Sequence, residues 1–197
     1  MHDTPNTTKN TVPTDRELAE LSAENPEYFG ALMERHEAPL LRYIRRLSSL
    51  PREDAEDILQ ETFIKAYRNI RDLDPSAKFS SWIYRITHNQ TIDILRKRKI
   101  DAASFSIEAN DAAQFLRATT DIAVETERKE TLSRIETIVR ELPETYREAL
   151  ILRFLEEKSY EEIMDILELP KGSVATLVHR GKKLLRERMD AVGITKE

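Results

Sequence analysis

The chain has 197 residues, of which 40% are hydrophobic, and it carries a formal net charge of -5 at pH 7. This length and apolar content exclude a disordered chain and allow one large or two small domains. The absence of cysteine excludes a disulfide framework, a thiol nucleophile and a Cys-based zinc site. Because no apolar run approaches the roughly 18 residues of a membrane span and no secretory signal is recognisable, we expect a cytoplasmic protein without membrane insertion.

Residues 1–14 are rich in Thr, Asn and Pro and are predicted to form a disordered tail. The rest of the chain has few glycines and no run of alternating apolar and polar residues, which predicts an all-α fold. A short helix is expected after Thr14 or Asp15. Asn25 and Pro26 are typical of an N-cap and a first helical residue, and we expect Pro39 to kink or interrupt the helix that they start.

A third helix is predicted to open at Pro51 and to run to about Ile70, with its acidic residues on the outer side. Five acids and one Arg lie between residues 51 and 61. Such a face is usually a solvated surface and cannot bind DNA favourably. If it is functional, it meets a basic protein surface, and Gln60 adds hydrogen-bonding specificity.

A basic helix from Ser80 to about Lys99 completes a first domain over residues 15–100. Its start is crowded with aromatic rings and amides, and cations follow at residues 96–99. Phe79 and Ile83 are predicted to be core residues, whereas Trp82 fits a core position and a base-stacking position equally well. Aromatic faces stack unpaired bases for about 1 to 3 kcal/mol each while cations hold phosphates, so this helix is a candidate site for single-stranded nucleic acid.

Residues 101–124 are small, polar and acidic and are predicted to be a flexible acidic linker. A second small helical domain over residues 125–190 follows, with residues 191–197 as a C-terminal tail. Within it, Ser159 and Glu162 form the pattern of a capping box, and Gly172 marks a tight turn before a final helix that we expect Ser173 to cap. This order of elements predicts a helix-turn-helix, although an ordinary helical hairpin with a basic outer face fits the same pattern.

The final helix offers side chains that could enter the major groove of DNA. The candidates are Lys171, Ser173, Thr176, His179, Arg180 and Lys183.

Three segments of the chain then carry a resemblance to a known family. They are DAEDILQETFIKAYRNI (54–70), FSSWIYRITHNQTIDILRKRK (79–99) and LPETYREALILRFLEEKSYEEIMDILELPKGSVATLVHRGKKLL (142–185). Together they resemble regions 2 and 4 of bacterial RNA polymerase sigma factors, most closely the small extracytoplasmic-function (ECF) group. The resemblance implies an alternative sigma factor that binds core RNA polymerase and directs promoter recognition, DNA melting and transcription initiation.

The resemblance also implies roles for individual positions. The polymerase-binding residues would be Asp54, Asp57, Gln60 and Glu61. The residues that open the minus-ten element and hold its non-template strand would be Trp82, Tyr84, Arg85, His88, Asn89, Asp93 and Arg96. The loop over residues 72–80 would capture a flipped base, and the final helix would read the minus-thirty-five element as duplex DNA.

By the same resemblance, the partners are core RNA polymerase, promoter DNA in duplex and single-stranded form, and an anti-sigma factor, with no cofactor. The family commonly carries Lys and Arg where this chain has Ala175 and Leu177, and Ala where it has Gly181. We therefore expect the first-domain helix to carry the larger share of promoter selectivity.

Three function classes other than a sigma factor are alternatives for this sequence. A stand-alone helix-turn-helix transcriptional regulator would bind duplex DNA tightly without polymerase. A helical adaptor would bind only protein. An enzyme finds little support, because the four histidines have no metal-binding spacing and the sequence lacks a Gly-rich phosphate loop.

Overall fold

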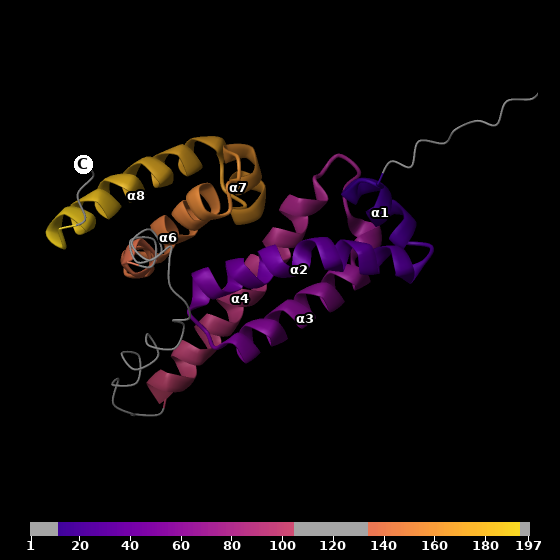
Figure 1. Ribbon diagram of the computed structural model, residues 1–197, viewed down its shortest axis with the longest axis horizontal. Coiled ribbons are helices and arrows are strands. Elements are labelled where there is room, and N and C mark those ends of the chain that lie inside the picture. The colour runs from indigo at the N-terminus through magenta and orange to yellow at the C-terminus, as the bar shows by residue number, and fades with distance from the viewer. Residues whose placement is uncertain (1–11, 105–133, 194–197) are drawn as a thin grey trace, which may run out of the picture.

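A computed structural model describes residues 12–104 and 134–193, and every regular element within those two ranges is helical (Figure 1). The prediction of an all-α fold is confirmed for these residues. The predicted tails lie largely outside the described residues, as do the predicted linker beyond Ser104 and the start of the second domain. None of the helices in the two described ranges is long and apolar enough to cross a lipid bilayer.

The first unit begins with α1 (Asp15–Ser22) and α2 (Pro26–Ser48). Thr14 caps α1 in a complete capping box with Glu17, and the Asn25 side chain accepts a hydrogen bond from the Glu27 amide at 2.9 Å. Both predicted helix starts are confirmed. Pro39 does not interrupt α2, because buried apolar side chains on both sides of it hold the helix against the core.

The unit is completed by α3 (Arg52–Arg68), the 3-10 turn η1 (Ile70–Asp72) and α4 (Phe79–Ser104). Its core is apolar and almost free of solvent, with Leu32, Leu40, Tyr43, Ile58 and Ile83 at 2% exposure or less. The helix α4 runs five residues beyond its predicted end at Lys99. Residues 101–104 are small or polar, which favoured a linker, but the two alanines among them also continue a helix readily.

The second unit contains a helix over residues 134–140, then α6 (Glu144–Leu150), the π-helical turn η3 (Ile151–Leu155), α7 (Tyr160–Leu167) and α8 (Lys171–Ala191). The predicted capping box at the start of α7 is confirmed, since Ser159 and Glu162 bond reciprocally at 3.2 and 2.8 Å. The predicted cap of the last helix was wrong. Pro170 occupies the N-cap position and accepts the Ser173 amide at 2.9 Å, so α8 starts two residues before Ser173.

The two units pack against each other in the structure. In Figure 1 the helices α6 and α7 lie beside α2 and α4. The contact is made mainly by α7 on α4, with η3 against α2. The sequence predicted two domains joined by a linker but contained no indication of this contact.

Candidate nucleic-acid interface

The predicted minus-ten residues lie on α4, and five of them share one face of that helix. Their spacing of three or four residues places them along a single stripe. Asn89, Asp93 and Arg96 are exposed, and Trp82 and Arg85 are half-buried. This stripe offers an aromatic ring, an amide and two guanidinium groups to a ligand that lies along the helix.

Trp82 stands at the border between the core and this stripe. Its ring lies 5.7 Å from the ring of Phe79, which is 4% exposed. Phe79 and Ile83 are core residues, as predicted. Because Trp82 packs on Phe79 but remains half-buried, it has both a fixed position and an accessible surface.

Tyr84 and His88 lie on the opposite flank of α4, where they are 3% and 8% exposed. The His88 Nδ1 atom lies 2.9 Å from the Tyr43 hydroxyl. Burial, together with the positive charge of Arg96, lowers the pKa of His88 to about 4. The imidazole is therefore neutral at pH 7. In this arrangement the two side chains face α2 and the second unit rather than solvent.

The Tyr84 hydroxyl donates a hydrogen bond to the Glu156 carboxylate of the second unit at 3.0 Å. Arg46, on α2, donates to the same carboxylate at 2.7 Å and to the Leu155 carbonyl at 2.9 Å. The Lys158 ammonium lies 3.9 Å from the centre of the Tyr84 ring. Sequence reasoning missed Arg46, Glu156 and Lys158 as residues at this site, because Arg46 and Glu156 are 110 positions apart along the chain.

The predicted polymerase-binding residues lie on α3. Asp57, Gln60 and Glu61 are exposed on its outer face. Asp54 is half-buried, and its carboxylate pairs with the Arg98 guanidinium of α4 at 2.9 Å. Two apolar side chains continue this face toward the end of α3, Ile64 at 43% and Tyr67 at 40% exposure. The acidic face is therefore accompanied by an apolar surface that the sequence pattern did not indicate.

The predicted minus-thirty-five residues lie on α8, which Lys171 begins. Thr176, His179, Arg180 and Lys183 are exposed, and Ser173 is half-buried. Among the two positions that lack the family's cations, Ala175 is exposed, whereas Leu177 packs against the core of the unit. The residue at position 177 therefore contributes to packing rather than to the outer face.

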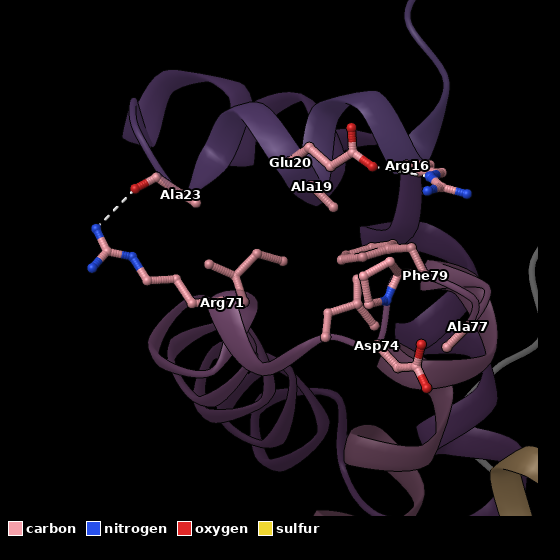
Figure 2. Close-up of a pocket in the computed structure, with 11 residues that line it drawn as sticks. Arg16, Ala19, Glu20, Ala23, Arg71, Asp74, Ala77 and Phe79 are labelled. Atoms are coloured by element: carbon pink, nitrogen blue, oxygen red, sulfur yellow. Dashed lines mark hydrogen bonds and ion pairs between the residues drawn. The ribbon is translucent and has the colours of Figure 1, made fainter.

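A cavity of about 210 Å³ opens beside the loop that precedes α4. It lies between α1, η1 and this loop, and Figure 2 shows Phe79, Ala77 and Asp74 on the loop side with Ala19 opposite. The Arg71 guanidinium closes one end by donating to the Ala23 carbonyl at 3.0 Å. In the described part of the chain, no three acidic or His side chains gather in an arrangement that could hold a metal ion.

Comparison with protein families assigns both units. Residues 32–100 match Sigma-70 region 2, and residues 132–185 match Sigma-70, region 4. Among solved structures, CnrH in complex with the cytosolic domain of CnrY is 28% identical, with a TM-score of 0.68 over 90% of this chain and 97% of CnrH. RpoE in complex with the anti-sigma factor NepR, from Bartonella quintana, shares the fold at 22% identity and a TM-score of 0.66 over 82% of this chain and 96% of RpoE.

The chain is also similar to characterised sigma factors. It is 38% identical to the ECF RNA polymerase sigma factor SigW of Bacillus subtilis, over 69% of this chain and 75% of SigW. It is 32% identical to the ECF RNA polymerase sigma-E factor of Haemophilus influenzae, over 89% of this chain and 95% of that protein. The chain therefore belongs to the ECF RNA polymerase sigma factors and is an alternative sigma factor that directs promoter-specific transcription initiation.

Proposed function

We propose that this sigma factor divides its work among three surfaces. The acidic outer face of α3 binds core RNA polymerase, the stripe on α4 opens the minus-ten element and holds its non-template strand, and α8 contacts the minus-thirty-five element. The observation that carries the proposal is the stripe itself, where Trp82, Arg85, Asn89, Asp93 and Arg96 share one face of α4. An aromatic ring next to amide and cationic groups suits unstacked bases and their phosphates.

On this proposal the chain performs no catalytic step of its own, and it acts in the cytoplasm, where polymerase and promoters meet. The net charge of -5 fits a protein that reaches DNA as part of a holoenzyme rather than alone. The α3 face supports polymerase binding through its accessible Asp57, Gln60 and Glu61, which are complementary to a basic protein surface.

The test is run-off transcription from a library of genomic fragments with core polymerase, with and without this chain. We expect specific transcripts only when the chain is present. A chain that bound duplex promoters equally well without polymerase, and left transcription at the level of core polymerase, would instead act as a stand-alone helix-turn-helix regulator.

We further propose that the cavity beside the loop over residues 72–80 receives a base flipped out of the opened strand. Phe79 and apolar Ala77 line one side of the cavity, and Arg71 lies at its other end. Ala77→Phe would fill part of this space without altering charge. We expect the variant to assemble with polymerase normally and to open a promoter found by run-off transcription at least tenfold less well. Normal opening would contradict this assignment.

An anti-sigma factor is proposed as the inhibitory partner, since RpoE of Bartonella quintana, which shares this fold, is bound by one. Such a partner would compete with polymerase for α3. Run-off transcription should therefore fall as the partner is added and recover as core polymerase is raised. Inhibition that no concentration of polymerase relieves would contradict competition at this surface.

A further inference from the structure

Carboxylates of the second unit face the cations that border the DNA-binding stripe of α4. Glu156 pairs with Arg46 at 2.7 Å, Glu162 with Lys78 at 3.5 Å and Glu168 with Arg85 at 3.7 Å. All three acids come from the second unit and all three cations from the first. One of these cations, Arg85, belongs to the stripe that is proposed to bind the promoter strand, which is a polyanion, and Lys78 and Arg46 lie on the elements beside it.

The pair between Arg46 and Glu156 is the anchor of this contact. The Glu156 side chain is 2% exposed and accepts hydrogen bonds from both Arg46 and Tyr84. The other two pairs are more open, with Lys78 at 68% and Glu168 at 64% exposure, and exposed pairs of this kind contribute little. Arg46 also lies 3.4 Å from the half-buried Glu136 carboxylate of the second unit, so the attraction at this face is concentrated around Arg46, with Glu156 as its most buried partner.

Local backbone geometry aims Glu156 at α4. The π-helical turn η3 ends with the Glu156 amide bonded to the Ile151 carbonyl at 3.0 Å. The next residue, Glu157, adopts a left-handed conformation with φ of 55°, which is uncommon for a residue with a side chain. This turn places Lys158 over the Tyr84 ring and leaves Glu156 directed at Arg46. The conformation is the kind of local strain that persists where surrounding contacts hold it.

We propose that in the free chain the second unit is an internal cover, whose carboxylates occupy the places that phosphates of single-stranded promoter DNA would take. This inference rests on the proposed role of α4 in strand binding and goes beyond it by naming what occupies that surface before DNA arrives. The strand and the second unit compete for Tyr84, Arg85 and the neighbouring cations. Charged, partly solvated contacts are typical of domain interfaces that open.

The anchor can be tested by Glu156→Gln, which keeps the size of the side chain and removes its charge. Glu157→Gln is the matched control, because it makes the same change one residue away at an exposed position. Dyes on cysteines introduced at Arg68 and Arg186, both exposed, report the separation of the two units in a chain that has no natural cysteine. Trp82, the single tryptophan, reports base stacking by quenching.

The ligand is an oligo(dT) strand of roughly a dozen nucleotides, within the usual site size for such surfaces. We expect Glu156→Gln to lower energy transfer between the dyes and to bind oligo(dT) about tenfold more tightly than the unaltered chain, as expected when a competing closed state is depopulated. The Glu157→Gln chain should stay within twofold of the unaltered chain, both in energy transfer between the dyes and in affinity for oligo(dT).

Equal oligo(dT) affinity for Glu156→Gln and Glu157→Gln would contradict the proposal that the second unit covers α4. Promoter opening by a holoenzyme that carries Trp82→Ala distinguishes failure of this proposal from failure of the proposed function. If Trp82→Ala abolishes promoter opening while Glu156→Gln leaves oligo(dT) binding unchanged, α4 binds the strand and the cover alone is wrong. If Trp82→Ala has no effect on promoter opening, the assignment of the strand to α4 is wrong, and the cover inferred from it is wrong as well.

Discussion

The helices α4 and α8 are both proposed to contact promoter DNA, but they stand in different surroundings. The outer residues of α8, such as His179 and Arg180, are exposed. On α4, Tyr84 and His88 are buried against α2 and the second unit, and Arg85 faces a carboxylate of that unit. The difference suggests that the duplex-reading surface is available in the free chain, whereas part of the strand-binding surface becomes available only when the two units separate.

The largest expected effect comes from Trp82→Ala. Removing the ring should lower promoter opening by the holoenzyme about 100-fold, since stacking of a base on an aromatic ring is worth roughly 1 to 3 kcal/mol. Reactivity of minus-ten thymines to permanganate measures opening, and binding of the variant to core polymerase is the control. Unchanged opening would show that Trp82 is only a core residue packed on Phe79.

The pH dependence of closure is a further expected effect. Burial, helped by the nearby Glu144 charge, raises the pKa of Glu148 to about 7, and its carboxylate lies 3.9 Å from His88 Nε2. Since the pKa of His88 is lowered, this contact is no ion pair at neutral pH. A carboxyl whose pKa is raised in the closed state favours closure at low pH, and this contribution is lost as the pH rises from about 4.5 to about 7.

Between pH 6.5 and 8 the Glu148 contribution should therefore weaken closure about fourfold, and His88, which regains its ordinary pKa when the units separate, offsets about half of this. Below pH 6.5 the sign of the His88 contribution remains opposite to that of Glu148, because its lowered pKa favours the closed state only while the imidazole is uncharged. Energy transfer between the two units measures the effect. Glu148→Gln should remove the loss of closure between pH 6.5 and 8, and a loss that survives this change would assign the dependence to another group.

On α8, Arg180→Ala should weaken binding of the holoenzyme to duplex promoter DNA several-fold, which is much less than the effect of Trp82→Ala on opening. If Arg180 contacts a phosphate, the slope of log affinity against log salt should fall by about one. Titrations at several salt concentrations measure both quantities. If Thr176→Ala and Arg180→Ala changed promoter choice more than Trp82→Ala and Asn89→Ala, the ranking of the two helices would be reversed.

The smallest expected effect is Gly181→Ala, which tests the packing behind α8. Alanine favours a helix by about 1 kcal/mol over glycine, but a methyl group at this position would lie 3.1 Å from the Leu150 side chain. Leu150 is 2% exposed and has little space to move. We expect the overpacking to outweigh the helix preference, with a net destabilisation of about 1 kcal/mol.

Chemical denaturation measures the Gly181→Ala change directly. Combining it with Leu150→Val, which trims the crowded side chain, should recover stability relative to Leu150→Val alone. A clear stabilisation by Gly181→Ala in the otherwise unaltered chain would show that α6 and α8 can separate slightly without cost.

Short-range features of this fold could be predicted from the sequence. The N-caps at Asn25 and Ser159 depend on residues within three positions of each other, and both were predicted. The start of α8 was wrong because Pro170 and Ser173 are both plausible caps, and only the bond from the Ser173 amide to the Pro170 carbonyl decides between them.

The candidate site was predictable only in part. Trp82, Asn89 and Arg96 stand on one face of α4 because helical spacing determines which residues align. Arg46 and Glu156 could not be connected in advance, since nothing local relates an arginine on α2 to a glutamate that follows a π-helical turn. The same holds for the burial of Tyr84 and His88, which depends on where the second unit packs.

The claim that the second unit covers α4 until a strand binds can be tested most directly in the chain that carries dyes at positions 68 and 186. Trp82 fluorescence and energy transfer between the dyes are measured together while oligo(dT) is added. If the strand displaces the second unit from α4, quenching of Trp82 and loss of energy transfer will reach half-saturation at the same oligo(dT) concentration. Quenching of Trp82 with unchanged energy transfer would mean that the strand binds α4 while the second unit stays in place, and it would contradict the account.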